Sequence, residues 1–271
     1  MKTLCLFLIL LYPVASSAQF KLPSFPSTGS DWVVVGTTDF SPGEVADVDL
    51  AIGPGQMPYT VFQSPGTGQG KACVMKYNGS EWEFVGDPYF SPDNINWPSI
   101  AFSPDQQPYI AFNDYAVNTR VSVMRHSGTS WQFVGNEGLP ESYNGGPRLA
   151  FNPATGEPYV EFHDGNQISV MRFDGNQWVY VGPRQFSPEA SSPDFGFNPV
   201  DGLPYVVYVD SPNNGKVTLD KFTGTGWVHV GNPGFTPRVA FTARLAFDHS
   251  GHPLVLISEQ RDTVLSFSVF M

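Results

Sequence analysis

A fivefold internal repeat constrains the fold of this chain more than any other feature of its sequence. A tryptophan followed three residues later by Val-Gly recurs five times, at spacings of 50, 49, 47 and 49 residues. A second pattern, Ala-Phe-x-Pro followed by Pro-Tyr, accompanies it in each period and is clearest at residues 101–109. The tryptophans of the W-x-x-V-G motif are Trp32, Trp82, Trp131, Trp178 and Trp227. A fixed period of this length indicates one structural unit repeated along the chain.

Each period contains four short strand-like runs separated by turn residues. In the second period these runs cover residues 99–102, 109–113, 120–126 and 130–134. The chain has 27 Gly and 25 Pro, which supply the turns, and no run shows a helical period. Four antiparallel strands per repeat are typical of a propeller blade. The sequence therefore predicts an all-β, five-bladed β-propeller.

The two ends of the repeat array predict how the ring closes. A lone strand at residues 31–35 precedes the first full blade, and a lone strand at residues 263–270 ends the chain. We expect the N-terminal strand to complete the last blade, because closure removes exposed sheet edges. One position of the innermost strand is always small, as five strands converging on one axis require. Its residues are Ala51, Ala101, Ala150, Gly196 and Ala246.

The N-terminus has the pattern of a secretory signal. Lys2 precedes an apolar run and a small-residue stretch, so residues 1–18 are predicted to be a signal peptide cleaved after Ala18. Residues 19–30 would be a linker and residues 31–271 the propeller. The alternative is an apolar N-terminal strand. We expect an extracellular protein with no other membrane-inserting segment, and the net charge of −11 argues against nucleic acid as a partner.

The repeats resemble those of a known group of proteins. The W-x-x-V-G and AF-x-P…PY motifs resemble those of secreted five-bladed β-propeller repeat proteins, over about residues 31–271. The blade length, the blade count and the single cysteine of the mature chain, Cys73, are similar to the tachylectin-type lectins. The resemblance implies ligand sites on one face, near the blade junctions.

Acidic residues recur in the loops of that face. Asp114, Asp164 and Asp210 each follow a Pro-Tyr strand. They either bind sugar hydroxyls or cap the loop through its own backbone. Charged residues also begin the innermost strands, where Asp49, Asp194 and Arg148 would be catalytic if the protein were an enzyme. The alternative is a charge-balanced plug that closes the central channel.

Aromatic residues that depart from the repeat supply the remaining candidates. Trp97 lies in the predicted loop 93–98, and its counterparts in the other blades are not tryptophan. Tyr89, Tyr115 and Tyr143 are placed in loops of the same face. A flat aromatic ring beside Asn and Asp suits a pyranose ring. Each could instead be folded over a blade junction.

These patterns favour a secreted, carbohydrate-binding, lectin-like module whose partner is a glycan or polysaccharide. We find no motif for a cofactor or a metal, so none is expected. One alternative is a polysaccharide-active glycosidase or lyase with its site at the central channel mouth. The other is an extracellular protein-interaction scaffold, which would expose an apolar patch.

Overall fold

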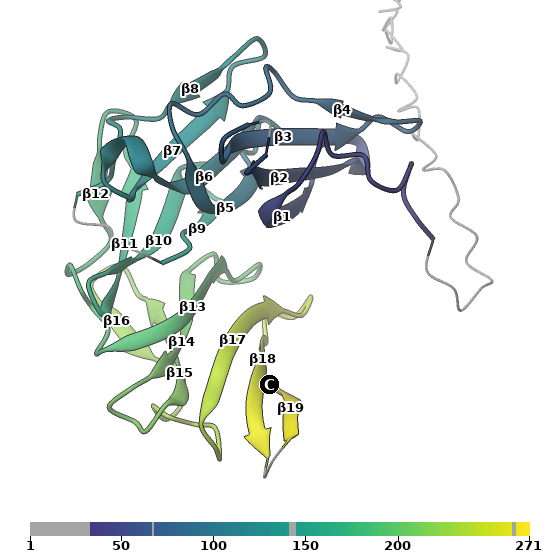
Figure 1. The fold of residues 1–271 in the computed structure, drawn as a ribbon. Helices are drawn as coiled ribbons and strands as arrows, with labels where there is room; N and C mark the ends of the chain where they lie inside the picture. Colours follow the sequence, from purple (N-terminus) through teal and green to yellow (C-terminus); the bar gives the residue numbers. More distant parts are fainter. Residues whose placement is uncertain (1–32, 67, 141–144, 262–263) are drawn as a thin grey trace, which may run out of the picture. The chain divides into compact units, whose positions relative to one another are not determined.

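The strands form five antiparallel sheets, one per repeat (Figure 1). The computed structural model describes residues 33–66, 68–140, 145–261 and 264–271. In the first sheet, the strands are β1 (Ala46–Ile52), β2 (Pro58–Ser64), β3 (Lys71–Tyr77) and β4 (Trp82–Phe84). In the second, they are β5 (Ile95–Phe102), β6 (Pro108–Asp114), β7 (Arg120–His126) and β8 (Trp131–Phe133).

The other three sheets repeat this order. The third contains β9 (Arg148–Phe151), β10 (Pro158–Asp164), β11 (Gln167–Phe173) and β12 (Trp178–Tyr180). The fourth contains β13 (Ala190–Phe197), β14 (Pro204–Asp210), β15 (Lys216–Phe222) and β16 (Trp227–His229). The fifth contains β17 (Ala240–Phe247), β18 (Pro253–Arg261) and β19 (Val264–Phe270). Short 3-10 turns occur at η1 (Pro54–Gln56) and η2 (Tyr115–Val117). The predicted all-β, five-bladed propeller is confirmed.

Aromatic pairs fill the space between neighbouring blades. The Tyr that follows each Pro packs edge-on against the Phe of the next innermost strand, as Tyr109 does against Phe151 with centroids 4.9 Å apart. Tyr59 with Phe102 and Tyr159 with Phe197 make the same contact. Because both partners recur in the repeat, the same packing is built at successive blade junctions, and the aromatic content of the chain is mostly core.

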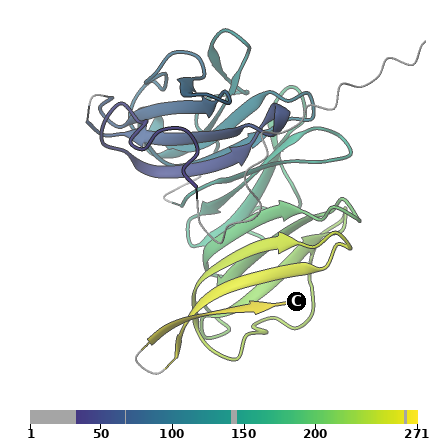
Figure 2. The same cartoon turned by 90° about the vertical axis from the view of Figure 1, so that its right-hand side faces the viewer.

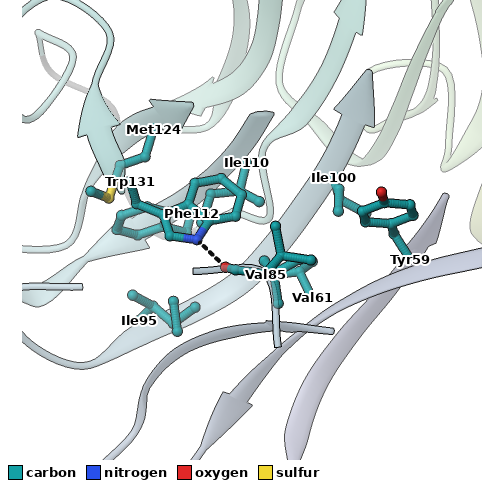
Figure 3. Packing of buried hydrophobic residues seen from close by; sticks show 11 residues of the cluster. Tyr59, Val61, Val85, Ile95, Ile100, Ile110, Phe112, Met124 and Trp131 are labelled. Carbon is teal, nitrogen blue, oxygen red and sulfur yellow. Dashed lines mark hydrogen bonds between the residues drawn. The ribbon is translucent and has the colours of Figure 1, made fainter. Parts of the chain in front are cut away.

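A tryptophan hydrogen bond also joins successive blades. The Nε1–H of Trp131 donates to the Val85 carbonyl at 2.7 Å, across the cluster that includes Ile110 and Met124 (Figure 3). This partner satisfies the indole N–H inside an otherwise apolar junction. The W-x-x-V-G motif thus supplies both groups of the bond, the donor from one repeat and the acceptor from the repeat before it.

The last blade has three strands in the described part of the chain. Strand β19 lies at the edge of its sheet, which Figure 2 shows in yellow. Residues 33–35 are not in a strand, and residues 31–32 lie outside the described residues. Ring closure by the N-terminal strand therefore stays a prediction.

The predicted signal peptide and linker, residues 1–30, also lie outside the described residues. Within the part of the chain that the structure describes, no helix has the length and apolar character needed to cross a membrane.

Candidate functional site

The innermost strands of all five blades contribute to one concave pocket of about 380 Å³. This volume is within the usual range for small-molecule sites, roughly 300–1,000 Å³. The polar and aromatic residues that line it are Asp47, Trp97, Arg148, His163, Ser192 and Arg244. All except His163, which is on β10, lie on an innermost strand. The pocket lies where the sequence placed the mouth of the central channel.

Local irregularities of the innermost strands form the rim of this pocket. The pairing register of β5 with β6 shifts between Asn96 and Ser99, and that of β13 with β14 shifts between Ser191 and Asp194. Trp97 and Ser192 occupy these bulges with φ values of 48° and 47°. A bulge turns its residue away from the regular alternation of the strand. Trp97 consequently belongs to β5, and the predicted loop 93–98 is partly strand.

Side chains at the rim tie each innermost strand to the next. Asp49 Oδ2 accepts from the Ile100 backbone N–H at 2.9 Å. The equivalent Asp194 Oδ2 accepts from the Leu245 N–H at 2.8 Å. The hydroxyl of Ser99, at the same repeat position, accepts from the next strand in the same way. This position therefore connects neighbouring blades.

The predicted catalytic carboxylates are engaged by these contacts. Asp194 also pairs with Arg148, whose Nε lies 3.2 Å from Oδ1. The second oxygen of Asp49 accepts from the adjacent Leu50 N–H. Arg244 donates to the Ala243 carbonyl at 2.7 Å and does not pair with Asp49 in the structure. These contacts hold neighbouring blades together, and they do not form a catalytic dyad.

A buried carboxyl beside this group was missed by the sequence reasoning. Glu161 is fully buried, and neither of its carboxyl oxygens has a hydrogen-bond partner within the described residues. Burial raises its pKa from the ordinary 4.5 to about 8, with nearby Arg148 opposing and Asp194 adding to the shift. Glu161 is opposite Arg148 in the β10–β9 register. The sequence did contain a signal for Glu161, because the equivalent positions in other blades are apolar. They include Val61, Ala111 and Val207.

His163 lies on the same strand and reaches the pocket lining. Its Nδ1 has no partner within the described residues, and desolvation lowers the pKa of the ring. The unpartnered Nδ1 is itself buried, so it does not face a ligand in the pocket. His163 is thus a lining residue that the sequence reasoning did not name.

Of the four aromatic candidates, Trp97 lies in the pocket. It is 43% exposed, so part of its surface is open to a ligand. Tyr115 is equally exposed but lies outside the lining, with its hydroxyl 2.8 Å from the Asn96 amide. Tyr89 packs against the cluster of Phe62, Cys73 and Met75. Tyr143 lies outside the described residues.

The three loop aspartates are buried. Asp114 accepts from the Ser122 hydroxyl and the Ala116 N–H. Asp164 accepts from Ser169 and forms a two-pronged ion pair with Arg184. Asp210 likewise accepts from Thr218 and from Asn213. These contacts fit the loop-cap alternative, and a role for the three residues in ligand binding stays a prediction.

The described residues contain no group of three or more His, Cys, Asp or Glu side chains that could hold a metal ion.

No protein-family model matches this sequence, and no curated protein matches it either. Solved structures do share the fold. A mutant of AofleA from Arthrobotrys oligospora matches with a TM-score of 0.57 and 12% identity, covering 83% of this chain and 68% of that one. A mutant of Aleuria aurantia lectin in complex with Fucα1-6GlcNAc matches with a TM-score of 0.53 and 12% identity, covering 83% and 74%. A protein of unknown function from Dyadobacter fermentans matches with a TM-score of 0.55 and 12% identity, covering 83% and 78%. At these identities the similarity shows the propeller fold alone.

Proposed function

We propose that this protein is a secreted carbohydrate-binding protein whose site is the pocket at the innermost strands. The observation that carries the proposal is that the half-exposed Trp97 lies in a concave pocket whose lining also includes polar and charged side chains. The apolar face of a sugar ring stacks on an aromatic surface, and its hydroxyls need donors and acceptors around the edge. Asp47 and Ser192 supply those groups.

Two further observations and one prediction from the sequence support this proposal. The bulges hold Trp97 and Ser192 on strands, so the site is organised before a ligand arrives. The complex of Aleuria aurantia lectin with Fucα1-6GlcNAc gives a precedent for sugar binding on a structure that resembles this one in fold. Export through the signal at residues 1–18 would place the protein where free and cell-surface glycans occur.

The contacts do not favour the glycosidase or lyase alternative. Asp194 is ion-paired with Arg148, and Asp49 accepts two backbone N–H groups. A general acid or base needs an oxygen that reaches the scissile bond. We therefore propose binding without turnover.

The test is a glycan array with the chain from residue 19 onward, followed by affinity measurements on the glycans it selects. We expect Trp97→Ala to weaken binding about tenfold or more, which corresponds to about 1.4 kcal/mol. Tyr115→Ala is the matched control, since both aromatic side chains are 43% exposed but Tyr115 is outside the pocket. Both variants should melt at the temperature of the unmodified protein.

Two results would contradict this proposal. One is the absence of binding to every glycan class on the array. The other is an unchanged affinity in Trp97→Ala together with a loss in Tyr115→Ala, which would move the site to the loops between blades.

A further inference from the structure

The motif tryptophan of the third blade differs from those of three other blades in what covers its ring. In those blades a phenylalanine lies parallel to the tryptophan, with interplanar angles of 8–12° and centroids 4.1–4.5 Å apart. The stacked pairs are Phe40 with Trp82, Phe90 with Trp131 and Phe186 with Trp227. Trp178 has a tilted contact with Phe173 at 5.5 Å, but no ring is stacked on it within the described residues.

The missing ring is explained by the sequence that follows β8. Leu139 is the counterpart of the stacked phenylalanines, because its N–H donates to the Val121 carbonyl as the Phe90 N–H donates to that of Ala72. In the other four repeats this position is Phe followed by Ser or Thr, whereas here it is Leu139 followed by Pro140. A leucine side chain is shorter than phenylalanine and has no flat face, so the stacked contact with the tryptophan cannot form.

A pocket of about 220 Å³ opens beside Leu139 and Trp178, and we call it the outer pocket. Its lining residues are 136 and 138–140, which follow β8, and 176–178, which lead into β12. The outer pocket therefore lies at the outermost strands of the junction between the second and third blades. It shares no lining residue with the pocket at the innermost strands, so the two are separate sites.

Three carboxamides contribute to the lining of the outer pocket. Asn136, Asn176 and Gln177 are all exposed, and their side chains make no hydrogen bond within the described residues. The turn is held in another way, because Asp174 Oδ1 accepts from the backbone N–H groups of residues 176 and 177 at 2.9 Å. The two turn amides are also not required by the repeat, since the equivalent pairs are Ser80-Glu81, Thr129-Ser130 and Thr225-Gly226.

These groups define the chemistry of a ligand. A carboxamide both donates and accepts hydrogen bonds, as a sugar hydroxyl does. An aromatic ring bordered by such groups suits the apolar face and the hydroxyls of a pyranose. No charged side chain is among the described residues that line the outer pocket, which favours a neutral sugar. Its volume is below the roughly 300–1,000 Å³ that is usual for small-molecule sites, which favours a single ring over a longer chain.

We propose that the outer pocket is a second carbohydrate site, in which one neutral pyranose ring packs against Trp178 where other junctions have a phenylalanine. The indole is already fixed, because its Nε1–H donates to the Val134 carbonyl at 2.7 Å. A ligand therefore meets a ring that is oriented before binding. This inference goes beyond the proposed pocket at the innermost strands, and either site can exist without the other.

The test uses the chain from residue 19 onward with Trp97→Ala, so that the pocket at the innermost strands does not contribute. The probes are glucose, galactose, mannose, fucose and N-acetylglucosamine, titrated by isothermal calorimetry and by ligand-observed NMR. We expect at least one of them to bind. Adding Leu139→Phe should weaken that binding about tenfold or more, because the new ring would fill the outer pocket as Phe90 covers Trp131.

Leu139→Ile is the matched control for this substitution. It conserves the apolar volume without adding a ring, so the affinity should stay within about twofold of the Trp97→Ala value. Thermal melting of each variant shows whether it is folded.

A second variant tests the carboxamides independently of the apolar wall. Asn176→Thr with Gln177→Ser reproduces the Thr129-Ser130 turn of the second blade and should weaken binding about fivefold or more. Absence of binding by the Trp97→Ala chain to every probe would overturn the proposal. An affinity unchanged by both Leu139→Phe and the turn variant would also overturn it. Probe binding that Trp97→Ala abolishes would support the pocket at the innermost strands and exclude the outer one, so the two proposals fail separately.

Discussion

At the scale of single residues, Glu161 differs from the other carboxyl groups because its burial keeps it protonated. It is fully buried, without a partner for either oxygen in the described part of the chain, and its pKa is raised to about 8. The carboxyl is therefore neutral at pH 7, while Asp194 and Arg148 beside it form an ion pair. The strand position opposite Arg148, a residue of the pocket lining, thus contains a proton that higher pH would remove.

The consequence is a pH dependence of stability with a defined sign. Between pH 4.5 and about 8 the unfolded chain loses the Glu161 proton while the folded chain keeps it. The free energy of unfolding should therefore fall as the pH rises through this window, by up to about 1.4 kcal/mol per pH unit, and level off above it. Urea unfolding at several pH values measures this slope.

Glu161→Gln should remove that part of the slope, because an amide does not titrate. Glu81→Gln, at an exposed turn, is the control and should leave the slope unchanged. If the Glu161→Gln variant kept the full slope, the pH dependence would have to be assigned to other groups.

At the scale of elements, the strands were predicted better than the bulges. The runs expected at residues 120–126 and 130–134 agree with β7 and β8 within a residue or two. The run expected from residue 99 begins at Ile95 instead, because a bulge lets the strand continue through Trp97 and Pro98. Alternation and turn residues identify regular strands, but a bulge depends on what the neighbouring blade offers to its backbone, such as Asp47 Oδ2 for the Trp97 N–H.

The hydrogen bond from the Trp131 indole to the Val85 carbonyl predicts that Trp→Phe changes the stability by different amounts at two positions. Trp131→Phe removes the bond to Val85 from a side chain only 8% exposed, which leaves a buried carbonyl short of a partner. We expect a loss of about 1–3 kcal/mol in the free energy of unfolding. Trp97→Phe, at the exposed rim, should change it by less than about 0.5 kcal/mol. Equal losses of unfolding free energy in chemical denaturation would mean that the Trp131–Val85 hydrogen bond adds nothing to stability beyond ring packing.

At the scale of the whole molecule, the residues that recur in every repeat predict the fold. The residues that depart from the repeat indicate the site. The fold could be predicted because the Trp, Val, Tyr and Phe positions that join blades recur at a fixed spacing. The pocket could be predicted only in outline, since Glu161 and His163 gain their character from burial against Arg148 and Gly145. Burial of a polar side chain is set by tertiary contacts, and strand patterns alone do not contain it.

The continuous junctions between blades also predict a cooperative molecule. Successive blades share an aromatic pair and a tryptophan hydrogen bond, and four of the hydrophobic clusters each extend over two blades. We expect one unfolding transition, coincident by tryptophan fluorescence and far-ultraviolet circular dichroism. Two separated transitions would show that some blades unfold independently.

The bulges at the start of the innermost strands have an evolutionary consequence. Asp47, Trp97 and Ser192 share a backbone role, with φ values between 44° and 48°, yet their side chains are unrelated. A scaffold that fixes the main chain and leaves the side chain unspecified allows new binding preferences to arise by point substitution. Randomising the Trp97 codon would explore ligand recognition, whereas Asp47 and Ser192 also accept backbone N–H groups of the next blade, from Trp97 and Ala243.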